Sequence, residues 1–414
     1  MSALAPTGSG QARAGGHRLR LSYAALKRGT LWLLTAVSGF ALIEPSPYEL
    51  AFLLALFVFA LTGIRFSQKL LPLALLLLLY NLGGVLSLIP WMDDPDSVRF
   101  TAVSVYLMIT CIVLAAIMAE DTVGRLDTLC RGYLFAAWCS GLAAILGYFD
   151  IAGLGGVFTL YGRASGTFKD ANVLGPFLVL PILYILQRVL TGRTSLPRGF
   201  ALISVPLFAL FLTFSRGAWG NLVASALLMV GLTFLVAPDA GRRARIVLLT
   251  LGAFAAAVVA LGIALSFESI REVFEVRASL VQDYDGGVTG RFGNQIRSIP
   301  LLLEAPNGLG PLRFRWHFPE DPHNVYINAF ASYGWLGGFA WLGLMAATCY
   351  VGWRLVFRRT PWQNHVIVIW PVLFVTILQG LQIDTDHWRH LYLMLGLVWG
   401  LAVLPPPSTK PTAP

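Results

Sequence analysis

Residues 71–90 read LPLALLLLLYNLGGVLSLIP, twenty positions without one charged side chain. About 20 predominantly apolar residues make a helix long enough to cross the hydrocarbon core of a bilayer. The whole chain shares this character, since 57% of its 414 residues are hydrophobic and only 12% are charged. Soluble domains are about one quarter charged. The bilayer is therefore the expected solvent of most of the chain, with little room for a separate soluble domain.

On either side of this stretch, clusters of Gly, Pro and charged residues divide the chain into further apolar runs. We predict an all-α polytopic membrane protein of about 12 transmembrane helices, of which the first is short for a membrane crossing. The predicted stretches are residues 30–43, 48–64, 69–89, 99–118, 126–148, 173–189, 199–214, 218–236, 246–266, 333–353, 364–381 and 389–404.

Basic residues indicate the orientation, because Lys and Arg near helix ends are retained in the cytoplasm. They gather in every second connection, at Arg65, Lys69, Arg125, Arg188, Arg193, Arg198, Arg242, Arg243, Arg245, Arg354, Arg358 and Arg359. The opposite connections include the acidic segment WMDDPDS at 91–97. Topology therefore explains the net charge of +9 better than a nucleic-acid partner does. We expect a bacterial inner-membrane protein with cytoplasmic tails at residues 1–29 and 405–414.

This orientation divides the chain into membrane helices 1–9 (30–266), a long periplasmic loop (267–332) and membrane helices 10–12 (333–404). The loop begins with FESIREVFEVRASL at 267–280, whose helical spacing of apolar residues predicts a short amphipathic helix at the interface. The four cysteines lie in or beside apolar runs and are interpreted as packing residues. Most of the remaining polar residues gather in the connections of the periplasmic side, where we look for function.

Two periplasmic connections carry cations beside apolar runs. Arg216 lies in the short segment TFSRGAW at 213–219, so its guanidinium faces either a polar cavity or anion, or the lipid headgroups. Arg163 and Lys169 lie in YGRASGTFKDAN at 161–172, where Gly, Ser and Thr leave backbone N–H groups available to an anion. Asp170 and Asn172 precede an apolar run, which is equally typical of helix capping.

The long loop adds a second group. Arg291 and Arg297 lie near the expected start of another amphipathic helix, and His323 with Asn324 stands at the entrance of an aromatic-rich apolar segment. Headgroup contact for Arg291 and a structural role for His323 remain alternatives. The segment QIDTDHW at 382–388 matches no closed metal site and is interpreted as an interfacial polar loop. No metal, nucleotide or redox cofactor motif is present.

Four segments together resemble the O-antigen ligase and polymerase superfamily of bacterial envelope glycosyltransferases. They are GRASGTFKDANVLGPF at 162–177, TFSRGAW at 213–219, TGRFGNQIRSIPLLLEAPNGLGP at 289–311 and DPHNVYINAFASYGWLG at 321–337. The resemblance implies a fold of the glycosyltransferase-C type with a periplasmic active site. Its functional positions fall on Arg216, Arg291 and His323 as catalytic residues. Arg163, Lys169, Asn324 and Arg297 are the residues we expect to bind pyrophosphate or glycan.

The reaction implied is transfer of O-antigen from undecaprenyl pyrophosphate to lipid A-core, without metal or cofactor. Residue chemistry fits this reaction, because arginines neutralise the charge that develops on a pyrophosphate leaving group. A neutral His323 would activate the attacking hydroxyl as a general base, giving direct displacement with inversion. A polymerase that uses the same donor is the main alternative. A secondary transporter is the alternative from another class, but the chain shows no twofold repeat.

Overall fold

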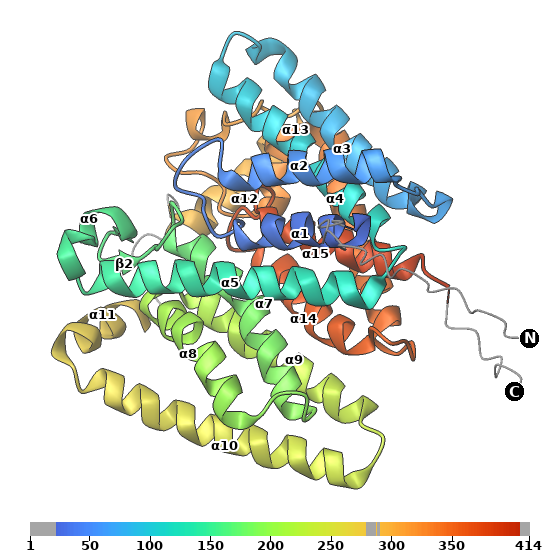
Figure 1. Cartoon of the computed structure of the whole chain (residues 1–414). Coiled ribbons are helices and arrows are strands. Elements are labelled where there is room, and N and C mark those ends of the chain that lie inside the picture. Colours follow the sequence, from blue (N-terminus) through green and yellow to red (C-terminus); the bar gives the residue numbers. More distant parts are fainter. Residues whose placement is uncertain (1–21, 279–286, 288–289, 406–414) are drawn as a thin grey trace, which may run out of the picture.

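The computed structural model describes residues 22–278, 287 and 290–405. Each predicted membrane stretch overlaps a helix (Figure 1). These helices are α1 (Tyr23–Ala36), α2 (Pro47–Thr62), α3 (Leu71–Leu88), α4 (Pro95–Ile117), α5 (Thr122–Tyr148), α7 (Ala171–Leu190), α8 (Leu196–Leu212), α9 (Arg216–Val236), α10 (Ala240–Leu265), α13 (Val325–Val356), α14 (Gln363–Gln379) and α15 (Arg389–Ala402).

The connections hold shorter elements. The longer ones are α11 (Glu268–Ala278) and α12 (Arg291–Leu303), which are the two helices expected in the loop 267–332. The others are η1 (Gln68–Leu70), η2 (Ile89–Trp91), η3 (Ile151–Gly153), α6 (Gly155–Phe158), η4 (Phe314–Trp316) and a small antiparallel hairpin of β1 (Thr159–Leu160) and β2 (Arg163–Ala164).

Among the described residues, seven helices are long and apolar enough to cross a membrane. Three further apolar helices, α2, α8 and α14, are shorter. The prediction of an all-α polytopic membrane protein is confirmed.

Two helix starts differ from the prediction. The first helix begins at Tyr23, within the expected tail 1–29, because Ser22 caps it by accepting a 3.2 Å hydrogen bond from Ala25 N–H. The remainder of that tail, and residues 406–414 of the other, lie outside the described residues. Helix α13 begins at Val325 and not at 333, and it is interrupted at Gly334, where φ is 65° and ψ is −172°. Only glycine adopts this conformation readily, so α13 consists of two segments, 325–333 and 335–356.

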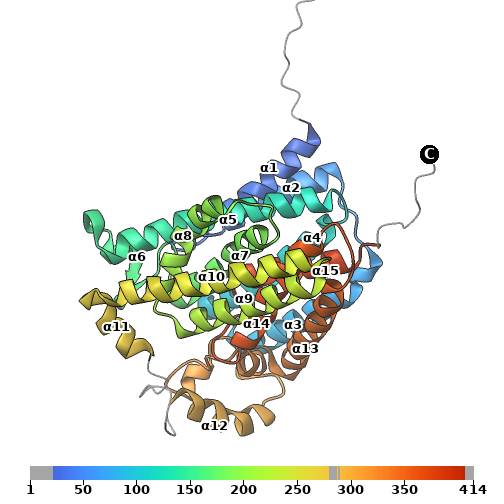
Figure 2. The ribbon, with the colours of Figure 1, turned by 90° about the horizontal axis from the view of Figure 1, so that it is seen from below.

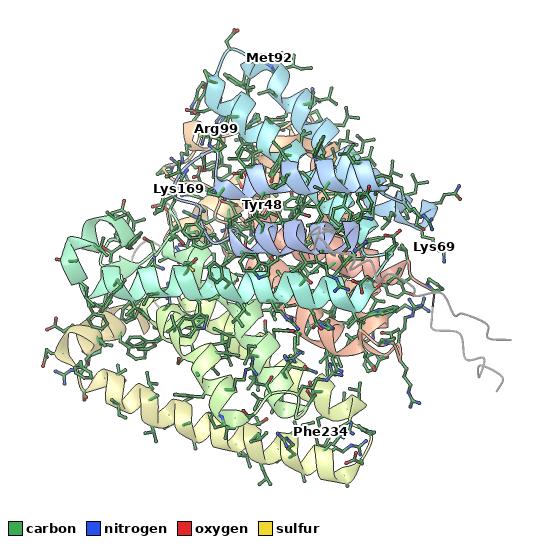
Figure 3. All side chains as sticks on the ribbon, viewed as in Figure 1. Tyr48, Lys69, Met92, Arg99, Lys169 and Phe234 are labelled. Atoms are coloured by element: carbon green, nitrogen blue, oxygen red, sulfur yellow. The ribbon has the colours of Figure 1, made fainter. Side chains whose placement is uncertain are left out.

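The two faces of the bundle carry different residues. In Figure 3, Lys69 lies at one end of the molecule, and Met92, Arg99 and Lys169 lie toward the other. The start of α1 and the end of α15 lie at the Lys69 end (Figure 1). Lys69, from one of the basic connections, therefore lies at the end opposite to Met92 and Lys169 from two of the polar connections, as the sequence predicts for these residues.

Packing differs sharply between α15 and α10. Gly396 and Gly400 bring α15 against the backbone of α4, since a Cβ at these positions would lie 2.7 Å from Cys111 O and 2.6 Å from Ala115 O. Small residues four apart allow such close approach of membrane helices. In α10 the only buried residue is Ile246, and the helix lies on the near surface in Figure 2. Protein packing therefore fixes α15, whereas lipid surrounds most of α10.

Replacing Gly396 by Leu should lower the stability of the protein in detergent by about 1–3 kcal/mol, the usual cost of forcing extra volume into a packed interior. The matched control is Gly252→Leu in α10, because a Cβ at Gly252 meets no atom within 4 Å. Thermal unfolding of both purified variants checks this. Equal melting temperatures for the two variants would contradict the packing.

Candidate functional site

The first part of the site is the turn that leads into α9. Arg163 donates from Nε to Thr213 O at 2.8 Å and from a terminal nitrogen to Asn172 Oδ1 at 2.7 Å. Ser215 Oγ also donates to Asn172 Oδ1, at 2.9 Å. Phe214 has a φ of +45°, which ends α8 and allows a new helix to begin. Arg163 is therefore held against the turn that presents Arg216.

Arg216 is the first residue of α9 and is half-buried. A helix N-terminus carries partial positive charge and exposed N–H groups, which favour anions. Arg216 and Arg163 add two full positive charges at the same place. Asp170 caps α7 by accepting from Asn172 N–H at 2.8 Å, as expected, while the Asn172 side chain orients Arg163. This arrangement suits a phosphate or pyrophosphate group.

The end of α14 connects this turn to the start of α13. A Cβ at Gly217 would lie 2.9 Å from Gln379 Nε2, and Asn221 Nδ2 donates to Gln379 Oε1 at 2.8 Å. The next residue, Gly380, accepts a 2.7 Å hydrogen bond through its carbonyl oxygen from Val325 N–H. The N-termini of α9 and α13 are therefore both anchored on the C-terminus of α14.

His323 precedes the cap of α13 and is half-buried. Its φ is +46°, a conformation that costs energy for a residue with a side chain and must be held by its surroundings. Asn324 caps the helix through Oδ1, which accepts from Tyr326 N–H at 3.0 Å and Ile327 N–H at 3.3 Å. The Asn324 side chain therefore bonds mainly to backbone N–H groups of α13. Of the two residues, His323 is the better candidate for a chemical role.

Helix α12 packs against this turn. Gln295 Nε2 donates to Pro322 O at 2.9 Å, and its Oε1 lies 3.5 Å from Asn324 Nδ2. Arg291, the first residue of α12, lies close enough to act on His323: burial lowers the pKa of His323, and the positive charge of Arg291 lowers it further. The structure therefore brings Arg291 and His323 together, although they are 32 positions apart in the chain.

The loop between α14 and α15 contacts the backbone next to His323. Asp384 Oδ1 accepts from Asn324 N–H at 3.0 Å. Asp386, which is buried, accepts from Asn328 Nδ2 at 3.3 Å and interacts with His387 Nδ1 at 3.1 Å. Burial raises the pKa of Asp384 to about 8, with contributions from the negative charges of Asp386 and Asp321. Sequence reasoning gave this loop no role at the site, and the alternating Asp residues of QIDTDHW were the available signal.

Two of the residues that we expected to bind pyrophosphate or glycan, Lys169 and Arg297, contact other side chains of the protein. Lys169 Nζ lies 2.5 Å from Glu44 Oε1, and Glu44 also pairs with Arg99, so Lys169 belongs to a separate charged cluster (Figure 3). Arg297 donates to Asn294 Oδ1 at 2.6 Å and lies 5.6 Å from the Phe318 ring centroid. Within residues 22–278, 287 and 290–405, no group of three or more His, Cys, Asp or Glu side chains is arranged to hold a metal ion.

Asp384→Asn should make thermal stability less dependent on pH. The Asp384 carboxyl keeps its proton in the fold up to a pKa of about 8 but ionises near pH 4 in the unfolded chain. Its contribution to stability is therefore present below pH 4 and is lost as the pH rises toward 8 and above. Asparagine retains an oxygen acceptor without the charge, so the variant should be the more stable protein at pH 9. Melting curves between pH 5 and 9 test this against Asp93→Asn, which changes an exposed carboxyl; identical pH slopes in all three proteins would refute it.

Residues 200–342 match the family model described as O-antigen ligase. The match extends from α8 into α13 and includes Arg216, Arg291 and His323, while Arg163 precedes it. No curated protein matches the chain. Residues 200–342 are thus similar to the O-antigen ligase domain, and this match supports the O-antigen ligase superfamily that the sequence resembles.

Proposed function

We propose that this protein transfers O-antigen polysaccharide from undecaprenyl pyrophosphate to lipid A-core at the periplasmic face of a bacterial inner membrane. A function of the O-antigen ligase and polymerase type follows from the family match; the donor, acceptor and mechanism are our proposal. The observation that carries it is the packing of α12, which begins at Arg291, against the His323 turn through the hydrogen bond from Gln295 to Pro322 O, next to the end of α14 that also contacts α9.

The arginines are the basis for our proposal about the donor, whose pyrophosphate leaves during the reaction. When the bond between the anomeric carbon and the pyrophosphate oxygen breaks, its electron pair leaves with the polyprenyl pyrophosphate, and negative charge grows on the phosphate. We assign that charge to Arg216, Arg163 and the N–H groups at the start of α9, with Arg291 at the start of α12 as a further cation. Fixed, preorganised cations stabilise a developing charge without reorganising during the reaction.

His323 supports the acceptor half. A sugar hydroxyl is a weak nucleophile, and a neutral imidazole within hydrogen-bond reach can take its proton as the oxygen attacks the anomeric carbon. The lowered pKa of His323 keeps the ring neutral at pH 7. Attack opposite to the departing pyrophosphate inverts the anomeric centre, and the proton ends on a ring nitrogen of His323.

The distribution of charge supports the orientation. The candidate residues lie in the connections that alternate along the chain with the Arg- and Lys-rich connections. Basic connections are retained in the cytoplasm, so in this proposal the candidate site faces the periplasm and both termini of the chain face the cytoplasm. Lipid-linked donor and lipid acceptor would both reach the site from the membrane.

His323→Ala should reduce transfer by about 10²–10⁴-fold, the usual contribution of a general base. Arg216→Ala should reduce it by about 10²–10³-fold, as loss of a charge-stabilising group does. The assay uses purified protein, undecaprenyl-pyrophosphate-linked glycan and lipid A-core in the presence of a chelator. His317→Ala, an exposed histidine of the same loop, is the control and should retain the parent rate.

The products of this assay also separate the alternatives. Glycan on lipid A-core identifies a ligase, whereas longer donor-linked chains with untouched lipid A-core identify a polymerase. Full activity of a folded His323→Ala protein would exclude the proposed base.

The pH dependence gives an independent check. Activity should fall as the pH drops below the lowered pKa of His323, because protonation removes the base. Arg291→Gln removes a positive charge that lowers this pKa, so in the residual activity of that variant the acid limb should move to higher pH. Arg297→Gln, about two turns along α12, should leave the limb in place. A limb that stays unchanged in Arg291→Gln, or moves equally in both variants, would argue against His323 as the titrating base.

A further inference from the structure

A groove lies at the end of the bundle opposite to the candidate site. It is formed by the α9–α10 and α13–α14 connections and has a volume of about 770 Å³. Its wall combines apolar residues with two arginines, and it is lined by Leu235, Val236, Ala237, Pro238, Arg243, Phe357, Arg359, Thr360, Pro361 and Gln363. A groove of this size admits a phosphate-bearing headgroup together with the first part of its acyl chains.

Among the described residues, the positive charges of Arg243 and Arg359 in the groove have no carboxylate partner. The Arg243 guanidinium lies 5.7 Å from the centroid of the Phe234 ring, which Figure 3 labels. In contrast, neighbouring Arg242 pairs with Asp239 at 3.3 Å. Thr360 Oγ1 is buried and finds no hydrogen-bond partner among the described residues. Two cations therefore line one open volume.

The apolar part of the wall indicates a lipid in place of a free anion. Leu235 is 63% exposed and Phe357 is 46% exposed, and each lies at or just beyond the membrane end of its helix. A soluble phosphate would leave both side chains uncovered, whereas acyl chains would cover them. The retention of basic loops in the cytoplasm explains why arginines are present here, but not why these two line an apolar-walled groove without acidic partners.

We propose that this groove binds an anionic phospholipid of the leaflet opposite the candidate site, with phosphate between Arg243 and Arg359. Basic pockets between membrane helices bind such headgroups by charge complementarity. The bound lipid connects α10, which packs little against the rest of the protein, to the α13–α14 connection. The site does not depend on the proposed transferase reaction, because none of its residues belongs to the candidate catalytic groups.

The test measures thermal stability of the purified full-length protein in neutral detergent with increasing cardiolipin. Phosphatidylethanolamine and inorganic pyrophosphate are added in parallel. Cardiolipin should raise the melting temperature, and Arg243→Gln combined with Arg359→Gln should weaken its apparent affinity about 30-fold. This follows because each arginine near an anionic surface contributes about 1 kcal/mol. Arg242→Gln, the matched control on the same helix turn, should keep the affinity of the parent.

Each alternative outcome has a defined meaning. An equal response to phosphatidylethanolamine, or an unchanged cardiolipin affinity in the double variant, would overturn the site. A shift produced by inorganic pyrophosphate alone would overturn the lipid and indicate a site for free phosphate. If the double variant fails to fold, the two single variants replace it, each with an expected loss of about fivefold.

Discussion

The hydrogen bond from Val325 N–H to Gly380 O is the contact on which the site depends. The N–H groups at the start of a helix have no partner within that helix, and unsatisfied backbone groups at a membrane edge are costly. Here the C-terminus of α14 supplies an acceptor to α13, while Gln379 contacts α9. The end of α14 thereby satisfies the start of α13 and also contacts α9, so two loops with separate cationic residues lie on either side of it.

The strained, left-handed backbone conformation of His323 persists because several hydrogen-bond partners hold the turn. Asp384 holds the Asn324 N–H, Gln295 holds the Pro322 carbonyl, and Asn324 caps the following helix. Removing one partner leaves the others in place, so the left-handed backbone is fixed by elements from three regions of the chain. A backbone fixed in this way would suit the general-base role that we propose for His323, because such a role needs an imidazole held in one position.

The sequence was sufficient to predict the all-α membrane architecture, because hydropathy reports the solvent of each segment directly. It also made Arg216, Arg291 and His323 candidates, because a charged or titratable residue beside an apolar run is costly and needs a reason; their roles stay predictions. The partnership of Asp384 with Asn324 was not predictable, since the two are 60 positions apart and two helices separate them. The pairing of Lys169 with Glu44 was missed for the same reason: loop residues far apart in sequence are joined only by the three-dimensional packing of the helices.

The interruption at Gly334 has a consequence for behaviour in different membranes. A spanning helix tilts when its apolar length does not match the bilayer thickness, and segment 335–356 is long enough to respond in this way. Segment 325–333 is attached to it through one glycine and is held instead by α12, Gly380 and Asp384. Trp335, which begins the spanning segment, also donates to Leu302 O of α12 at 2.9 Å, so α12 contacts the chain on both sides of Gly334. When the spanning segment tilts, we expect α12 and the His323 turn to move with it as one unit, which would keep the start of α12 beside His323 in bilayers of different thickness.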